Sequence, residues 1–319
     1  MTSTDEPRGR TAKKPSHIPA KGWKDILLRT KDELDADHVS VVSAGVAFFG
    51  LLALFPAIAA IILIAGLVVD PMVVEQQIES FAAGLPQNTA EILENQARKV
   101  AAGANTTLGW AALGSILFAI YGASKGVKTL MVGMNVAYDE DETRGFLRIN
   151  ATALVLTVLM VLVLVIAMGL MIVLPLLADG LGLPSFIQTF VFYGRWVLLA
   201  LIAFGGLSVL YRYGPSRDAP EWRWVTPGSV AAVTVWLLAS IAFAFYVRNF
   251  GSYNETYGAL GGVIVLLMWL WVSSYIVLLG AELDSEIEHQ TRLDTTVGPN
   301  ERMGNRDAIK ADTLGEEKT

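Results

Sequence analysis

Long runs of hydrophobic residues alternate with short polar segments along most of this 319-residue chain. Six of these runs reach about 20 residues, the length that an α-helix needs to cross a bilayer. They lie at about 39–69, 107–135, 147–178, 187–212, 226–250 and 257–282. Backbone groups in lipid must bond within their own segment, and the runs are too long for barrel strands. The pattern therefore predicts an all-α, polytopic integral membrane protein with a bundle of six transmembrane helices.

The polar segments that flank the runs divide the chain into four parts. Residues 1–22 are basic and lack apolar periodicity, so we expect a disordered N-terminus. Residues 23–38 place apolar side chains at helical spacing among Lys and Asp, which predicts an amphipathic helix. This helix lies either on the membrane surface or against the loops of the bundle. Residues 39–284 form the membrane domain, and the polar residues 285–319 are expected to be a disordered tail.

The longest connection, residues 70–106, joins the first two hydrophobic runs. It holds two stretches of apolar residues at helical spacing, separated by Pro86, Gln87 and Asn88. This pattern predicts two short helices on the extracytoplasmic face.

Lys and Arg residues lie mainly in alternate connecting segments. They gather in residues 1–38, after the second and fourth runs, and in the C-terminal segment, whereas the intervening connections hold few. Positive residues favour the cytoplasmic side of a membrane. The asymmetry predicts that both termini are cytoplasmic, in agreement with an even number of spans.

Composition narrows the class of function. The chain is 53% hydrophobic and 17% charged, with a formal net charge of -6. This charge argues against a nucleic-acid partner, which requires a clustered basic face. The absence of cysteine excludes thiolate metal sites and cysteine nucleophiles, and no two of the three histidines have metal-ligand spacing. The string GASKG at 122–126 matches a nucleophile motif only by chance, because it falls inside a predicted membrane helix. We therefore predict no catalytic residue, metal or cofactor, and no enzymatic activity.

Two lysines within the second run are the main candidates for function. Lys125 and Lys128 share a helix face with Asn135, two turns further along. A charge inside a membrane span is expensive, so these residues predict a polar pathway for an anionic head group. Asn254 and Tyr257, at the start of the last run, would then line its outer mouth. The alternative, of equal weight, is that both lysines extend to the inner membrane interface.

Other residues suggest packing and ion pairing. Gly122 and Gly126, and Gly258 and Gly262, form two G-x-x-x-G steps at which helix backbones can approach closely.

Glu282 and Asp284 end the last run on the side that also holds Arg212 and Arg217. We expect surface ion pairs between these acids and arginines, and a proton-relay role is the alternative.

Three stretches carry a family resemblance. They are SAGVAFFGLLALFPAI at 43–58, SKGVKTLMVGMNVAYDEDETRGF at 124–146, and the segment 211–283, which begins YRYGPSRDAPEW and ends VLLGAEL. In these stretches the chain resembles the YihY/BrkB family of bacterial inner-membrane proteins. The resemblance implies a multi-pass protein of the bacterial inner membrane, in contact with membrane lipids. The family has carried the label ribonuclease BN, now regarded as a misassignment, and this chain lacks the His and Asp cluster of a zinc ribonuclease.

Some members of that family are associated with serum resistance, and others with export of lipid or lipopolysaccharide precursors. The resemblance therefore implies transport or export of an amphipathic, anionic, lipid-like substrate for the cell envelope. The alternative hypothesis is a non-catalytic membrane scaffold for envelope assembly.

Overall fold

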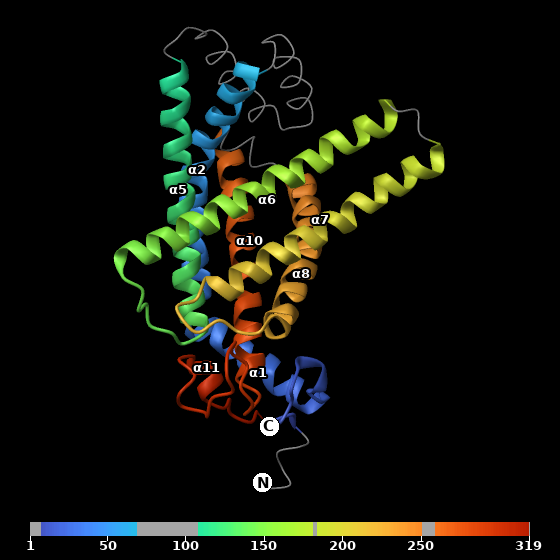
Figure 1. Ribbon diagram of the computed structural model, residues 1–319. Helices are drawn as coiled ribbons and strands as arrows, with labels where there is room; N and C mark the ends of the chain where they lie inside the picture. Colours follow the sequence, from blue (N-terminus) through green and yellow to red (C-terminus); the bar gives the residue numbers. More distant parts are fainter. Residues whose placement is uncertain (1–7, 69–107, 181–183, 251–258, 319) are drawn as a thin grey trace. The chain divides into compact units, whose positions relative to one another are not determined.

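The computed structural model describes residues 8–68, 108–180, 184–250 and 259–318. Within these ranges the regular elements are helices, together with a single isolated β-bridge between Pro220 and Thr296. The helices are α1 (Ala20–Ala36), α2 (Val39–Val68), α5 (Leu108–Ala137), α6 (Phe146–Gly180), α7 (Ser185–Tyr213), α8 (Trp222–Phe250), α10 (Ala259–Glu288) and α11 (Ile309–Asp312), with a 3-10 turn at Pro15–His17 (Figure 1). The prediction of an all-α chain is confirmed for the described residues.

Several of these helices are long and apolar enough to cross a membrane. Four stretches of the described residues qualify, namely Phe146–Met171, Phe186–Tyr213, Trp222–Arg248 and Gly261–Glu288. A fifth span is present if α1 and the first part of α2, which form a bent pair, count together. The chain is thus a multi-pass membrane protein, as its hydrophobic runs predict. The expected helices within 70–106, and residues Asn254, Tyr257 and Gly258, lie outside the described residues.

The chain forms two compact units. The first comprises residues 1–43, 128–238 and 275–319, and the second comprises residues 44–127 and 239–274. Because α2, α5, α8 and α10 each contribute to both units, every contact below is described within one unit.

In the second unit, α5 packs closely on α2. A Cβ atom added to Gly122 would lie 3.2 Å from Cα and Cβ of Ala53, and one added to Gly126 would lie 3.7 Å from Cβ of Phe49. The absence of a side chain at Gly122 therefore permits the two backbones to approach. Gly262, of the other expected step, lies on α10.

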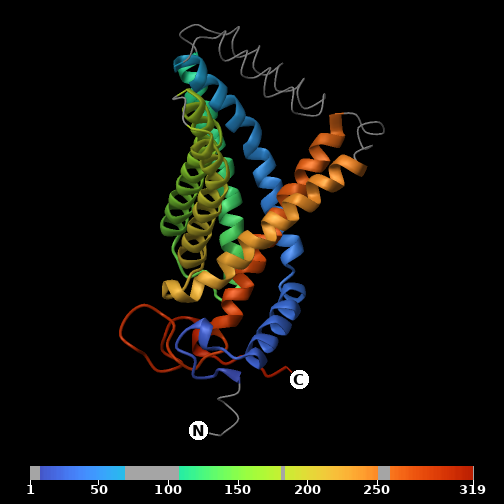
Figure 2. The same ribbon diagram turned by 90° about the vertical axis from the view of Figure 1, so that its right-hand side faces the viewer.

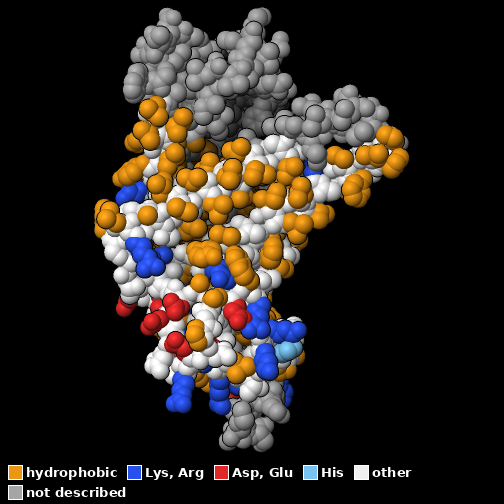
Figure 3. Space-filling view, viewed as in Figure 1, with side chains coloured by type: hydrophobic (Ala, Val, Ile, Leu, Met, Phe, Trp, Pro, Cys, Tyr) orange, Lys and Arg blue, Asp and Glu red, His pale blue; other side chains and the backbone are white. Residues whose placement is uncertain are grey.

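In the first unit, α6 and α7 run side by side in opposite directions (Figures 1 and 2). Hydrophobic side chains cover these two helices, whereas charged side chains gather around α1 and α11 (Figure 3). The exposed apolar surface is that of a membrane-embedded helix pair.

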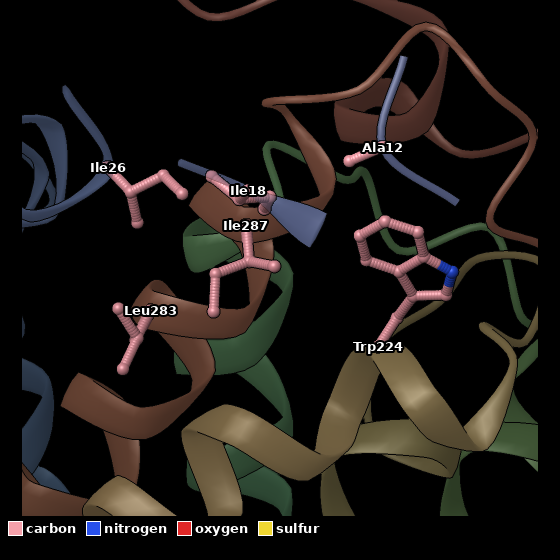
Figure 4. Close-up of a cluster of buried hydrophobic side chains, with 6 residues drawn as sticks. All are labelled: Ala12, Ile18, Ile26, Trp224, Leu283 and Ile287. Carbon is pink, nitrogen blue, oxygen red and sulfur yellow. The ribbon is translucent and has the colours of Figure 1, made fainter. Parts of the chain in front are cut away.

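We call the charged part of the first unit the polar base. It consists of residues 8–38, residues 282–318, and the loops 138–145 and 214–221. Its apolar centre contains Ala12, Ile18, Ile26, Trp224, Leu283 and Ile287 (Figure 4). These side chains come from the N-terminal segment, α1, α8 and α10. They bring together parts of the chain that are far apart in sequence.

Both terminal segments differ from the expectation of disorder. Residues 8–22 and 285–318 are ordered and bind each other: Arg10 Nη2 donates to the Gly315 carbonyl at 2.7 Å, and Thr291 Oγ1 donates to the Ala12 carbonyl at 2.8 Å. Hydrogen bonds and ion pairs, rather than an apolar face, hold these segments in place. α10 also continues to Glu288, beyond the expected end of the last run at 282.

Candidate functional site

Four acidic residues occupy the last two turns of α10. The side chains of Glu282, Asp284, Glu286 and Glu288 are fully buried in the polar base. A buried charge without partners is strongly unfavourable, so the surroundings of each carboxyl group determine what it can do.

Glu286 lies between two cations. Arg29 on α1 forms an ion pair with it, and Lys310 Nζ on α11 lies 2.9 Å from its Oε1. The Arg29 guanidinium also donates to Gln290 Oε1 at 2.9 Å, and Lys310 makes a second ion pair with Asp139 at 2.9 Å. Burial acts to lower the pKa of Lys310, but the charge of Glu286 and the hydrogen bonds to both acids outweigh it and raise that pKa above its ordinary value.

Glu288 and Asp284 have different partners. Arg217 Nη1 lies 2.5 Å from Glu288 Oε2, and the guanidinium lies over the Tyr138 ring, 4.8 Å from its centroid. Asp284 Oδ1 accepts a hydrogen bond of 2.6 Å from the backbone N–H of Gly228 on α8. These contacts fix α10 against α8 and against the loop 214–221.

The expected ion pairs are therefore replaced by others. Arg217 pairs with Glu288 rather than with Glu282 or Asp284, because the extra turns of α10 carry Glu288 to the loop that holds Arg217. Arg212 Nη1 donates to the Pro220 carbonyl at 2.8 Å, and its guanidinium lies 4.5 Å from the centroid of a Trp222 ring. Glu282 and Asp284 were also expected to lie at the surface, whereas both are fully buried.

Glu282 stands apart from the other three acids. Neither oxygen of its buried carboxyl group has a hydrogen-bond partner. Its neighbour is another acid, Asp37, which follows the last residue of α1 and can share a hydrogen bond with it when one of the two carboxyl groups is protonated. Burial raises the pKa of Asp37 above its ordinary value.

The three polar residues expected along α5 have separate surroundings. Lys125 Nζ lies over the Tyr121 ring, 5.3 Å from its centroid. Lys128 is half-buried and donates to Asn150 Oδ1 at 3.3 Å. Asn135 is buried and joins two loops, since its Oδ1 accepts from the Ser216 N–H at 2.7 Å and its Nδ2 donates to Glu142 at 3.0 Å. Asn135 is therefore occupied by structural contacts.

Sequence reasoning missed Arg29 and Lys310. A signal was present for Arg29: Asp25 and Arg29 are one turn apart on the same face of α1 as Ile26, so buried charges share the apolar side of the helix. Asp25 binds Arg8 at 2.5 Å. No comparable pattern marks Lys310, whose partners lie on other segments.

The described residues contain no group of three or more His, Cys, Asp or Glu side chains placed to hold a metal ion. Their charged groups instead bind one another and the backbone, so the polar base can fix helix ends.

The chain matches a known protein family over most of its length. The family model described as virulence factor BrkB matches residues 30–304. YfkH of Bacillus subtilis, which is named as ribonuclease-like, is 30% identical over 256 residues, covering 79% of this chain and 90% of that protein. A UPF0761 membrane protein of Tolumonas auensis is 34% identical over 87 residues, or 27% of this chain and 28% of that protein. The UPF0761 protein XCC0860 of Xanthomonas campestris is 36% identical over 86 residues, or 27% of this chain and 20% of its own. No solved structure matches the chain.

The family match spans α2, α5, α6, α7, α8 and α10, and the part of the polar base that lies within residues 30–304. Together with the apolar helices described above, it shows that this multi-pass membrane protein belongs to the BrkB virulence factor family.

Proposed function

We propose that this protein transports an anionic, lipid-like molecule across the bacterial inner membrane. In this proposal six helices span the membrane and both termini are cytoplasmic. The observation that carries it is the environment of Lys128, a cation on an apolar helix whose observed hydrogen bond is to a neutral group.

Lys128 lies half-buried on α5, and its ammonium group donates to the Asn150 amide oxygen. That amide is itself held by a hydrogen bond of 2.6 Å from its Nδ2 to the Phe146 carbonyl. A neutral acceptor satisfies one N–H of the lysine but does not balance its charge. A phosphate or carboxylate head group would supply the opposite charge.

The surface next to this position suits the rest of a lipid. Leu154, Val155 and Val158, which follow Asn150 on α6, are all exposed. An acyl chain could lie along these residues while its head group lies near Lys128. An amphipathic anionic substrate therefore fits both the charge and the apolar surface.

A reconstituted system tests this proposal. The full-length protein is placed in liposomes that contain a fluorescent phosphatidylglycerol, or a fluorescent phosphatidylcholine as the zwitterionic comparison, and movement between leaflets is followed by quenching of the outer leaflet. Wild type should accelerate movement of the anionic lipid. Lys128→Ala should reduce that rate about tenfold, because a hydrogen bond to a charged group contributes roughly 1.5 kcal/mol or more.

The variant Lys128→Arg keeps the charge and should retain most of the activity. Lys24→Ala, at an exposed position on α1, is the matched control and should behave as wild type. If wild type moves neither lipid faster than protein-free liposomes, the transport proposal is wrong and a scaffold role for this membrane protein becomes the better hypothesis.

A further inference from the structure

Among the four buried acids of α10, one carboxyl group has no donor. Glu286 contacts two cations, Glu288 contacts Arg217, and Asp284 accepts from a backbone N–H. Glu282 is equally buried, and neither of its oxygens has a hydrogen-bond partner. An ionised carboxylate in this position would lack both water and a donor, which strongly disfavours its charge.

The neighbouring acid, Asp37, further disfavours ionisation of Glu282. Asp37 follows α1 as its C-cap, where its backbone N–H donates to the Glu33 carbonyl at 2.8 Å. The C-terminal end of a helix carries partial negative charge, so it disfavours a carboxylate. Two adjacent carboxyl groups cannot both ionise readily in a buried place.

Besides Asp37, two charged groups act on Glu282: Glu286 of α10 opposes its ionisation, and Lys310 of α11 favours it. Glu33 of α1 faces Asp37, Glu286 and Lys310. Asp139, which follows α5, faces Asp37. Lys310 is the cation of this group, and it is already engaged by Glu286 and Asp139 at 2.9 Å each. Its charge is therefore largely balanced before it can compensate Glu282.

We propose that Glu282 and Asp37 form a proton-binding carboxyl pair that holds one proton at neutral pH. The proton comes from solvent by way of Asp37, which is only half-buried, and it is released along the same route when the pH rises. Binding converts a carboxylate into a carboxylic acid that can donate to the other carboxylate, so no co-reactant is required. The site stands without the transport proposal; only its coupling to lipid movement rests on that function.

Infrared spectroscopy of the full-length protein tests the pair directly. A protonated carboxyl group has a carbonyl stretching band that an ionised one lacks. At pH 7 wild type should show such a band, and titration with base should remove the part of it that Glu282→Gln lacks. Asp284 and Glu288, each with one unpartnered oxygen, remain in both proteins, so the wild-type minus variant difference spectrum is the readout. Glu301→Gln, at an exposed position in the C-terminal segment, is the control and should leave the band unchanged. Identical bands in wild type and Glu282→Gln would show that this pair holds no proton.

A second variant keeps the test valid if Glu282→Gln does not fold. Asp37→Asn removes the neighbouring acid, so Glu282 should lose its proton at a lower pH than in wild type. An unchanged titration in Asp37→Asn would overturn the pairing of the two residues.

If the band behaves as expected but wild type moves no lipid in liposomes, the transport proposal fails while the proton site stands. If both hold, a pH gradient should alter lipid movement in wild type but not in Glu282→Gln.

Discussion

Arg29 on α1 and Glu286 on α10 form a buried ion pair between residues 257 positions apart in the sequence. The same guanidinium donates to the Glu286 and Glu316 carbonyls, at 3.1 and 2.9 Å. One side chain thus binds α1, α10 and the C-terminal segment together. This ion pair should therefore contribute to the stability of the polar base, because it links these three segments.

Arg29→Ala should destabilise the polar base by about 3 kcal/mol, the lower part of the range for breaking a buried pair, because Lys310 still contacts Glu286. Thermal unfolding followed by tryptophan fluorescence measures this loss, and limited proteolysis should cut residues 289–318 faster. Lys31→Ala, at an exposed position on the same helix, is the control and should change neither. Equal protease resistance in Arg29→Ala and wild type would contradict the role given to this pair.

Gly228→Ala should destabilise the crossing of α8 and α10 by about 1–3 kcal/mol through overpacking. A Cβ atom at this position would collide with the Gly280 carbonyl and the Asp284 carboxyl group. The comparison is Gly114→Ala on α5, where a Cβ atom would meet nothing within 4 Å. That change should be neutral or stabilise the helix by up to about 1 kcal/mol. Thermal unfolding of both variants, measured side by side, checks the difference.

The loop 138–145 should loosen in acid through Glu142. The Arg144 guanidinium, which pairs with this carboxylate at 2.7 Å, lowers the pKa of Glu142 to about 2. A carboxyl group with a depressed pKa in the folded state stabilises above its unfolded pKa of about 4.5, and loses that contribution as the pH falls toward 2. Hydrogen exchange in this loop should therefore increase between about pH 4.5 and 2. In Glu142→Gln the exchange should already be faster at pH 7 and should depend less on pH in that window.

Asn135→Ala should remove the hydrogen bonds that hold the loops 138–145 and 214–221 to the end of α5. The Ser216 N–H would lose its buried acceptor and Glu142 would lose a donor, so a destabilisation of about 1–3 kcal/mol is expected. Ser216→Ala keeps that N–H and removes only the hydroxyl contacts to Thr143, so it should have a smaller effect. Hydrogen exchange of the loop 214–221 distinguishes the two variants. A residue that only lines a transport pathway would leave this exchange unchanged when replaced.

The helices could be predicted because hydrophobic length is a local property of the sequence. The run at 147–178, for example, corresponds to α6 at Phe146–Gly180. The end of α10 could not be predicted in the same way. Hydropathy falls at Glu282, where the acids begin, but the helix continues because Arg29, Lys310 and Arg217 neutralise two of them.

The terminal segments show the same limit. Residues 285–318 are polar and lack periodicity, which usually indicates disorder. They are ordered here because their partners, such as Arg10 and Arg29, lie near the other end of the chain. A single sequence does not reveal pairings over such distances. The environment of Lys128 was equally hidden, since its partner Asn150 belongs to a different helix.

The contacts of Arg10 with Gly315 and of Arg29 with Glu316 also set an order of events during synthesis. The two arginines leave the ribosome early, whereas their partners follow 305 and 287 residues later. Throughout insertion of the intervening helices, both guanidinium groups remain without these carbonyls and without Glu286. The polar base can therefore close only after the last membrane helix and the C-terminal segment have been made. Its assembly is a late event that follows synthesis of every helix between the two arginines and their partners.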